Sequence, residues 1–209
     1  MSPLYSPRKY WIEHGKKYKE QFQYNKRYRL QETILIDYLK SISHFSNVFE
    51  IGCGFGRITK LLLSNFPDIE EYIAVDISLY QIENAKDYIK EVCPQDTKIQ
   101  FLVSDISSLQ IDKKYDLVLA SEVLMHILPS DINEVIRKLV ELSKKHIVNI
   151  DWYEERTPKK IAPHNFIHRY QEIYNDLTSI RKINQIPIVK TGLLLKTFVN
   201  QSIFHAVKG

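Results

Sequence analysis

Three glycines at alternate positions, Gly52, Gly54 and Gly56, are the residues with the clearest chemical meaning in this sequence. They follow the apolar run 48–51 and precede a helix-like run that begins at Arg57, so the pattern predicts a buried strand, a tight turn and a helix. Glycines let the backbone turn sharply and approach a ligand, and the amides at the start of the helix face the same space. This turn therefore predicts a binding site for a nucleoside cofactor.

The spacing of the glycines indicates the kind of cofactor. A dinucleotide fingerprint has a third glycine or alanine three residues after the second one, where the helix packs closely on the strand. Here Arg57 occupies that position, and the third glycine comes one residue earlier. The turn therefore disfavours a nicotinamide cofactor.

Two further apolar runs also end in an acid. The run 72–75 ends at Asp76, and Ser78 with Gln81 has the spacing of a capping box, which predicts the start of a helix. An acid at the tip of a second strand can accept hydrogen bonds from both hydroxyls of a ribose, so we assign Asp76 to that role. The third run, 99–103, is followed by Ser104 and Asp105.

An acid at Glu50 followed by Gly-x-Gly-x-Gly at the end of a first strand resembles motif I of the class I methyltransferases, which use S-adenosylmethionine. In that family an acid and an aliphatic residue after the third strand contact adenine. The stretch 115–127 is similar to the family's motif IV, in which the fourth strand passes into a Val-Leu-x-His turn. The resemblance implies a cofactor site that contains Glu50, Gly52, Cys53, Gly54, Gly56, Asp76, Ile77, Asp105, Ile106 and Ser121.

A second interpretation of these strand ends stays open. In a doubly wound fold without a cofactor, the acids would serve only as helix caps and turn residues. The order and spacing of four such ends favour the cofactor site.

The rest of the sequence predicts the elements that position these residues. Apolar spacing and turn residues predict helices over 31–39, 58–66, 78–92, 130–144 and 165–177, and later strands over 146–151, 179–189 and 201–207. This order matches the sheet of the resembled family. We therefore expect an α/β fold with a doubly wound, mostly parallel seven-stranded sheet and an antiparallel last strand. The methyltransferase domain would span 46–209, with an insertion on the acceptor side at 151–178.

The front segment, 1–45, is unusually basic and aromatic. Residues 1–29 hold eight Lys or Arg and two Glu, whereas the whole chain has a net charge of only +4. The interleaved aromatic residues are Tyr5, Tyr10, Trp11, Tyr18, Phe22, Tyr24 and Tyr28. Such a surface could bind nucleic acid, but we favour a helical lid that turns its aromatics inward and its cations outward. In similar proteins a Tyr-Trp pair and a later Tyr contact the cofactor, which implies Trp11 and Tyr18.

Composition is typical of a single globular domain. A chain of 209 residues can bury one core, and 44% of its residues are hydrophobic. Cys53 and Cys93 are its only cysteines, which excludes a disulfide framework and a zinc cluster built from cysteines. Charged residues interrupt the first twenty positions, and no apolar run is long enough to span a membrane. We expect a cytoplasmic protein.

The histidines are the candidate bases. A sulfonium already carries an activated methyl group, so catalysis needs chiefly alignment of donor and acceptor. A base is needed only for a weakly acidic hydroxyl or a protonated amine, and we expect one with a pKa near neutrality among His126, His164 and His168. A structural role is the alternative for each. His164 and His168 would also share a helix face and could bind a metal beside Asp151 or Glu122, although we expect no metal site.

The resemblance implies an enzyme, an S-adenosylmethionine-dependent methyltransferase that releases S-adenosylhomocysteine. We expect a small-molecule acceptor, methylated at oxygen rather than nitrogen, near the three histidines and Tyr170. The basic front segment favours an anionic acceptor. We expect no membrane partner, because no apolar run is long enough to span a membrane. Two alternatives stay open: an inactive cofactor-binding interaction module, and an RNA or protein methyltransferase that uses the basic arm.

Overall fold

The computed structural model describes residues 6–22, 25–42, 44–92, 96–153, 161–191 and 196–209. Tyr5, Tyr24 and Cys93, which were considered above, lie outside these ranges. No helix among the described residues combines the length and the apolar character needed to cross a lipid bilayer.

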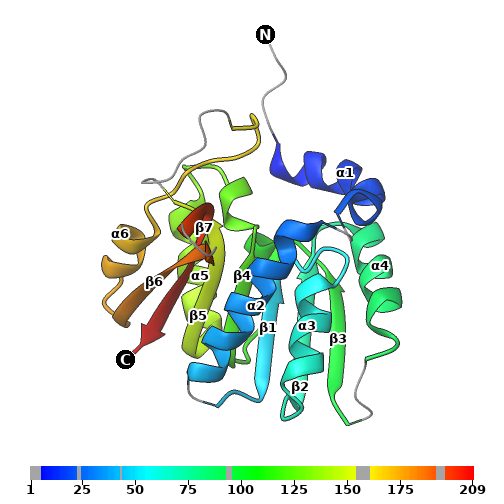
Figure 1. Ribbon diagram of the computed structural model, residues 1–209, viewed down its shortest axis with the longest axis horizontal. Helices are drawn as coiled ribbons and strands as arrows, with labels where there is room; N and C mark the ends of the chain where they lie inside the picture. The colour runs from blue at the N-terminus through cyan, green and yellow to red at the C-terminus, as the bar shows by residue number, and fades with distance from the viewer. Residues whose placement is uncertain (1–5, 23–24, 43, 93–95, 154–160, 192–195) are drawn as a thin grey trace.

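Seven strands form one sheet in the order β3-β2-β1-β4-β5-β7-β6 (Figure 1). The strands are β1 (Asn47–Ile51), β2 (Glu71–Asp76), β3 (Lys98–Val103), β4 (Tyr115–Ser121), β5 (Ser143–Trp152), β6 (Ile180–Thr191) and β7 (Lys196–Lys208). Neighbours from β3 to β5 pair in parallel, while β7 runs antiparallel to both β5 and β6. The predicted sheet, including its antiparallel last strand, is confirmed.

Helices cover both faces of this sheet, and each face has its own hydrophobic core. The helices are α1 (Pro7–Phe22), α2 (Lys26–Ser41), α3 (Arg57–Asn65), α4 (Leu79–Ile89), α5 (Ile132–Leu142) and α6 (Tyr170–Asn175). One core joins α5 and α6 to the sheet, and the other joins α2, α3 and α4 to the opposite face. On β1, Val48 and Phe49 point into different cores and are both fully buried, as expected in a parallel sheet covered on both sides.

The two helices of the front segment lie in different places. Leu35 and Leu39 of α2 are buried in the second core, so α2 is part of the packed domain. In contrast, α1 lies across the carboxyl end of the sheet beside α4 (Figure 1). Only α1 is therefore placed as a cover over that end.

The predicted helix over 165–177 is too long at its start. The helix α6 begins at Tyr170, and residues 161–169 have no regular secondary structure apart from a turn. The backbone of this stretch bonds elsewhere, because the Phe166 N–H donates to the Met125 carbonyl at 2.7 Å. His164 and His168 therefore lie in a loop, and the prediction that they share a helix face is wrong.

The predicted capping box at Ser78 is also wrong in detail. The Ser78 residue does precede α4, but its side chain makes no capping hydrogen bond. The Asp76 carboxylate accepts the Ser78 N–H instead, at 2.9 Å. The helix starts where the spacing predicted, with a different group satisfying its first amide.

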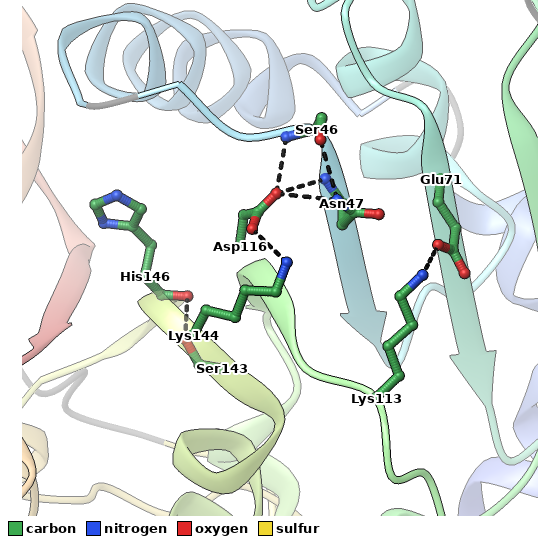
Figure 2. A network of polar contacts seen from close by, with 8 residues as sticks. All are labelled: Ser46, Asn47, Glu71, Lys113, Asp116, Ser143, Lys144 and His146. Atoms are coloured by element: carbon green, nitrogen blue, oxygen red, sulfur yellow. Dashed lines mark hydrogen bonds and ion pairs between the residues drawn. The ribbon is translucent and has the colours of Figure 1, made fainter.

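A polar network closes the amino end of the sheet (Figure 2). The Asp116 carboxylate accepts the backbone N–H groups of Ser46 and Asn47 at 3.1 and 3.0 Å and the Lys144 ammonium at 2.9 Å. Burial favours the neutral acid, but Lys144 and these amides outweigh it and hold the pKa of Asp116 well below its usual range. This network ties the start of β1 to β4 and β5.

Candidate functional site

A cavity of about 170 Å³ lies at the carboxyl ends of β1 to β4, beneath α1. Crevices at the carboxyl ends of strands are where open α/β sheets bind ligands. Of the predicted cofactor residues, those that line the cavity are Trp11, Tyr18, Glu50, Gly52, Cys53, Gly54, Asp76, Ile77, Asp105, Ile106 and Ser121. The structure therefore brings together residues from α1 and from four strand ends.

The three glycines of the turn each have a positive φ, but they serve different purposes. A side chain at Gly52 would collide with Val123, because its Cβ would lie 2.3 Å from a Val123 methyl carbon. A Cβ at Gly54 would meet nothing closer than the Gln81 amide nitrogen, at 3.7 Å, so this glycine leaves the backbone open to the cavity. Gly56 does not line the cavity and instead packs against Ala85 of α4, with φ +85°. Gly56 therefore allows the start of α3 to lie close to α4.

Asp76 joins the tip of β2 to the glycine turn. One of its carboxylate oxygens accepts the Gly54 N–H and the other accepts the Ser78 N–H, both at 2.9 Å. Burial raises the pKa of Asp76 to about 6, although these amides favour the charged form. The carboxylate is thus fixed in the cavity wall.

Asp105 combines the two roles that the sequence analysis considered. Its side chain accepts hydrogen bonds from the Ser107 N–H at 3.0 Å and the Ser107 hydroxyl at 2.9 Å, so it caps the short helix η1 (Ile106–Ser108). Asp105 and Ile106 also line the cavity. Capping therefore does not remove them from the predicted adenine site.

Glu50 lies deeper, and its partners belong to the protein. The Glu50 carboxylate accepts the Thr59 hydroxyl at 2.5 Å and the Tyr72 hydroxyl at 2.7 Å. Burial raises the pKa of this carboxyl to about 7. Glu50 thus links β1 to α3 and β2 beneath the glycine turn, while Cys53 has a thiol whose pKa burial raises well above its ordinary value.

The helix α1 packs closely on α4. Gly15 is its buried residue, and a Cβ there would lie 2.1 Å from the Ser78 hydroxyl oxygen. The Lys16 and Lys19 ammonium groups lie over the rings of Tyr80 and Tyr88, 5.0 and 5.7 Å from their centroids. These contacts join α1 to α4, with Gly15 buried where the two helices meet.

Two buried polar atoms in the cavity wall lack hydrogen-bond partners within the described chain. They are the Trp11 indole nitrogen and the Gln81 side-chain oxygen. A buried polar atom without a partner costs about 1–3 kcal/mol. A polar ligand in the cavity would relieve that cost.

The sequence analysis missed a polar cluster around Arg57. The Arg57 guanidinium donates to Glu32 at 3.1 Å and to Gln31 at 2.6 Å, and it lies 3.7 Å from the carboxylate of Glu122. Its carbon lies 4.0 Å from the centroid of the Tyr28 ring. The signal was present in the sequence, because a cation in the first turn of a helix opposes the helix dipole and needs a compensating acid.

Glu122, the second acid beside Arg57, has an unusual backbone conformation. Among the residues that the structure describes it is the only non-glycine with a positive φ, at 57°. Its carboxylate accepts the Gln201 amide at 2.6 Å, so β7 also reaches the cavity wall. Strain of this kind at a strand end is typical of functional sites.

The three candidate bases are separated by the fold. His126 lines the cavity, and its Nδ1 donates to the backbone carbonyl of His164 at 3.1 Å. His164 and His168 do not line this cavity, and the His168 side chain bonds the Ile127 carbonyl at 3.1 Å. Burial lowers the pKa of His126 to about 4, so the expected value near neutrality is wrong for this residue.

Asp151 supports the turn that carries His126. This fully buried carboxylate accepts the Met125 N–H at 3.1 Å and the Asn149 amide at 2.9 Å. Burial raises the pKa of Asp151 to about 8. In the described parts of the chain, no group of three or more His, Cys, Asp or Glu side chains is arranged to hold a metal ion.

Comparisons with known proteins agree with the fold. Residues 49–146 match the family model described as "Methyltransferase domain". The chain is 33% identical over 98 residues to a malonyl-[acyl-carrier protein] O-methyltransferase of Acetivibrio thermocellus, which covers 47% of this chain and 32% of that protein. It is 31% identical over 131 residues to a ubiquinone biosynthesis O-methyltransferase of Rickettsia akari, covering 63% and 49%. The chain thus spans between a third and a half of these curated relatives.

Solved structures share the whole architecture. Magnesium protoporphyrin IX methyltransferase from Synechocystis, solved with bound S-adenosylmethionine, superposes with a TM-score of 0.72 at 16% identity over the full length of both chains. The N-methyltransferase NodS from Bradyrhizobium japonicum gives 0.71 at 15% identity, covering 97% of this chain and 99% of that one. The chain therefore shares the fold of these methyltransferases, and residues 49–146 resemble a methyltransferase domain in sequence.

Proposed function

We propose that this protein transfers a methyl group from S-adenosylmethionine to a small-molecule acceptor, at oxygen rather than nitrogen. The observation that carries the proposal is the position of Asp76, whose carboxylate is fixed by Gly54 in the wall of a cavity. A ribose needs an acceptor there, and a glycine turn supplies the adjoining open backbone. S-Adenosylhomocysteine would be the product.

The residues of the cavity fit this cofactor. Asp76 would accept the ribose hydroxyls, and Asp105 with Ile106 would hold adenine, beside the open backbone at Gly54. The unpartnered Trp11 indole would gain an acceptor. When bound, the cofactor supplies an activated methyl group on sulfur. The protein's own contribution is to orient the two reactants and exclude water.

His126 is the candidate base that this geometry supports best. Because its Nδ1 donates to a backbone carbonyl, the neutral ring carries its lone pair on Nε2. Burial keeps the imidazole neutral at physiological pH. His126 could therefore accept a proton from an acceptor hydroxyl, while His164 positions it and His168 has a structural role.

The acceptor is inferred from the relatives and from charge. Both curated relatives described above are O-methyltransferases, which supports transfer to oxygen. Arg8 of α1 lines the cavity and forms no ion pair with the residues that the structure describes. An arginine in that position suits an acceptor with a carboxylate or phosphate. We therefore infer a small anionic acceptor.

The lid interpretation is supported over the nucleic-acid arm. A nucleic-acid arm would present its aromatic rings to solvent for stacking, whereas Trp11 and Tyr18 of α1 line the cavity. We assign the lid to α1 and the methyltransferase domain to 46–209, with α2 packed against that domain and 151–178 on the acceptor side.

Mass spectrometry of the small molecules that co-purify with the protein tests this function. Adenosylmethionine or adenosylhomocysteine at near-stoichiometric amounts is the expected result. A nicotinamide dinucleotide would overturn the proposal. If nothing co-purifies, isothermal calorimetry with adenosylhomocysteine decides, and absence of binding would overturn it.

A further inference from the structure

Tyr10 of α1 lies between two imidazole rings. Its ring stacks on His14 with centroids 3.9 Å apart and on His164 with centroids 4.4 Å apart, at interplanar angles of 17° and 27°. The Tyr10 hydroxyl also lies 3.4 Å from Nε2 of His164. A residue of the lid is thus joined to the loop on the acceptor side.

That loop holds the candidate base. The backbone carbonyl of His164 accepts the Nδ1–H of His126 at 3.1 Å, and the Trp11 ring lies 4.4 Å from the His126 ring. A carbonyl can only accept, so this bond fixes which nitrogen of His126 carries the proton. The helix α1 therefore touches both the base and the residue that sets its tautomer.

The bonds that hold the later part of the loop lie beyond His164. The loop lacks regular secondary structure, and its later part is held by the Phe166 N–H on Met125 and by His168 on Ile127. Those bonds lie two and four residues beyond His164. From outside the loop, His164 is reached by His126 and by the rings of Tyr10 and Trp11, whose centroids lie 4.4 and 6.0 Å from its own. Of these two lid residues, Tyr10 has the closer ring and the only parallel stack on His164 among the contacts described.

We propose that Tyr10 is a positioning residue, which holds His164 so that its carbonyl keeps His126 in the Nδ1–H tautomer while α1 is docked. The proposal rests on the proposed role of His126 as the base. If so, docking of α1 both covers the cavity and fixes the tautomer of His126. A site with α1 undocked would lack both its cover and a base of fixed tautomer.

Nitrogen-15 NMR of selectively labelled histidines tests this without knowledge of the acceptor. In the full chain with adenosylhomocysteine, the His126 Nδ1 resonance, assigned by comparison with a His126→Gln sample, should have the position of a protonated nitrogen. In Tyr10→Ala it should move toward the average of two exchanging tautomers. Tyr10→Phe, which keeps the ring, should restore most of the wild-type position.

The controls separate this proposal from simple damage to the lid. Tyr80→Ala removes a contact between α1 and α4 that involves no histidine, and it should leave the His126 resonances at their wild-type positions. If Tyr10→Ala lowers the melting temperature enough to confuse the comparison, Tyr10→Leu keeps the bulk without the aromatic ring. A wild-type tautomer of His126 in a folded Tyr10→Ala or Tyr10→Leu protein would overturn the proposal. If the wild-type protein does not bind adenosylhomocysteine, the proposed function is contradicted. The proposal about Tyr10 is then still tested, because the His126 tautomer can be measured without a ligand.

Discussion

The acids at the two ends of the sheet have pKa values that are shifted in opposite directions. At the amino end, Asp116 is paired with Lys144 and with backbone amides, and its pKa is lowered. At the carboxyl end, burial raises the pKa of Asp76 to about 6, of Glu50 to about 7 and of Asp151 to about 8. The acids at the first end are stabilised by the fold, and those at the second end are held in environments that favour their neutral forms.

This difference distinguishes acids that stabilise the fold from an acid that serves ligand binding. A carboxylate whose hydrogen bonds are completed within the protein contributes to the free energy of unfolding. An acid with a raised pKa that lines the cavity together with polar atoms without partners, as Asp76 does, is instead typical of a ligand site. Glu50 and Asp151 have partners within the protein and support the fold around that site. We therefore expect substitutions at the amino end to change folding and substitutions at the cavity to change binding.

Asp76→Ala should have the largest effect on binding. Loss of a charge-assisted hydrogen bond to the ribose should weaken binding of adenosylmethionine by on the order of 2 kcal/mol or more. Isothermal calorimetry on the folded variant measures this. Asp76→Asn is the matched control, since it keeps the shape and should lose less. Wild-type affinity in Asp76→Ala would remove this residue from the site.

Asp116→Ala should show the reverse behaviour. It leaves the amides of Ser46 and Asn47 without their acceptor, so we expect a loss of about 1–3 kcal/mol in the free energy of unfolding. Denaturant unfolding followed by circular dichroism measures the loss. Cofactor affinity, measured on the same sample, should remain at the wild-type value. A fall in affinity without a fall in stability would refute the division between the two ends.

The affinity for the cofactor should depend on pH through Asp76. Because the pKa of this carboxyl is raised to about 6, it gains a proton as the pH falls below that value and loses its strength as an acceptor. Affinity should fall by up to about tenfold per pH unit below pH 6. Calorimetry between pH 7 and pH 5 measures this, in wild type and in Asp76→Asn. An equal fall in Asp76→Asn would assign the dependence to another group.

The raised pKa of Asp76 makes folding stability depend on pH in the direction opposite to cofactor affinity. A carboxyl whose folded pKa is raised stabilises the folded state fully at pH values below its unfolded pKa, and this contribution is lost as the pH rises through about 6. For Asp116, whose pKa is lowered, the contribution is present above its ordinary pKa and is lost in acid. Asp76 and Asp116 therefore respond to pH in opposite directions.

Gly15→Ala should have the smallest effect on overall stability but a clear effect on the lid. The added methyl would clash with Ser78, while alanine favours the helix by about 0.5–1 kcal/mol over glycine. We expect a nearly unchanged melting temperature and faster proteolysis within α1 in the presence of adenosylhomocysteine. Lys17→Ala, at an exposed position of the same helix, is the matched control. Equal protection of α1 in both variants would show that α1 does not close through this contact.

The sequence predicted the fold because apolar strands and a glycine turn leave strong local signals. The positions of Asp76 and Asp105 after apolar runs could be read from the sequence, and the sheet followed from the resemblance to the class I methyltransferases. The loop before α6 could not be, because its backbone is held by Met125, which lies 41 residues earlier in the chain. The stack on Tyr10 could not be predicted for the same reason, since it joins distant segments. For Arg57 the sequence indicated the need for an acid, but the partners Glu32 and Glu122 come from distant segments and could not be identified.

A crystal structure of the protein with adenosylhomocysteine would test the central claim most directly. We predict that the ribose hydroxyls lie within hydrogen-bond distance of the Asp76 carboxylate and that adenine contacts Asp105 and Ile106. The amino acid part should lie against the glycine turn, with α1 docked over it. A nucleoside bound elsewhere, or an Asp76 carboxylate that does not contact the ribose, would contradict the account.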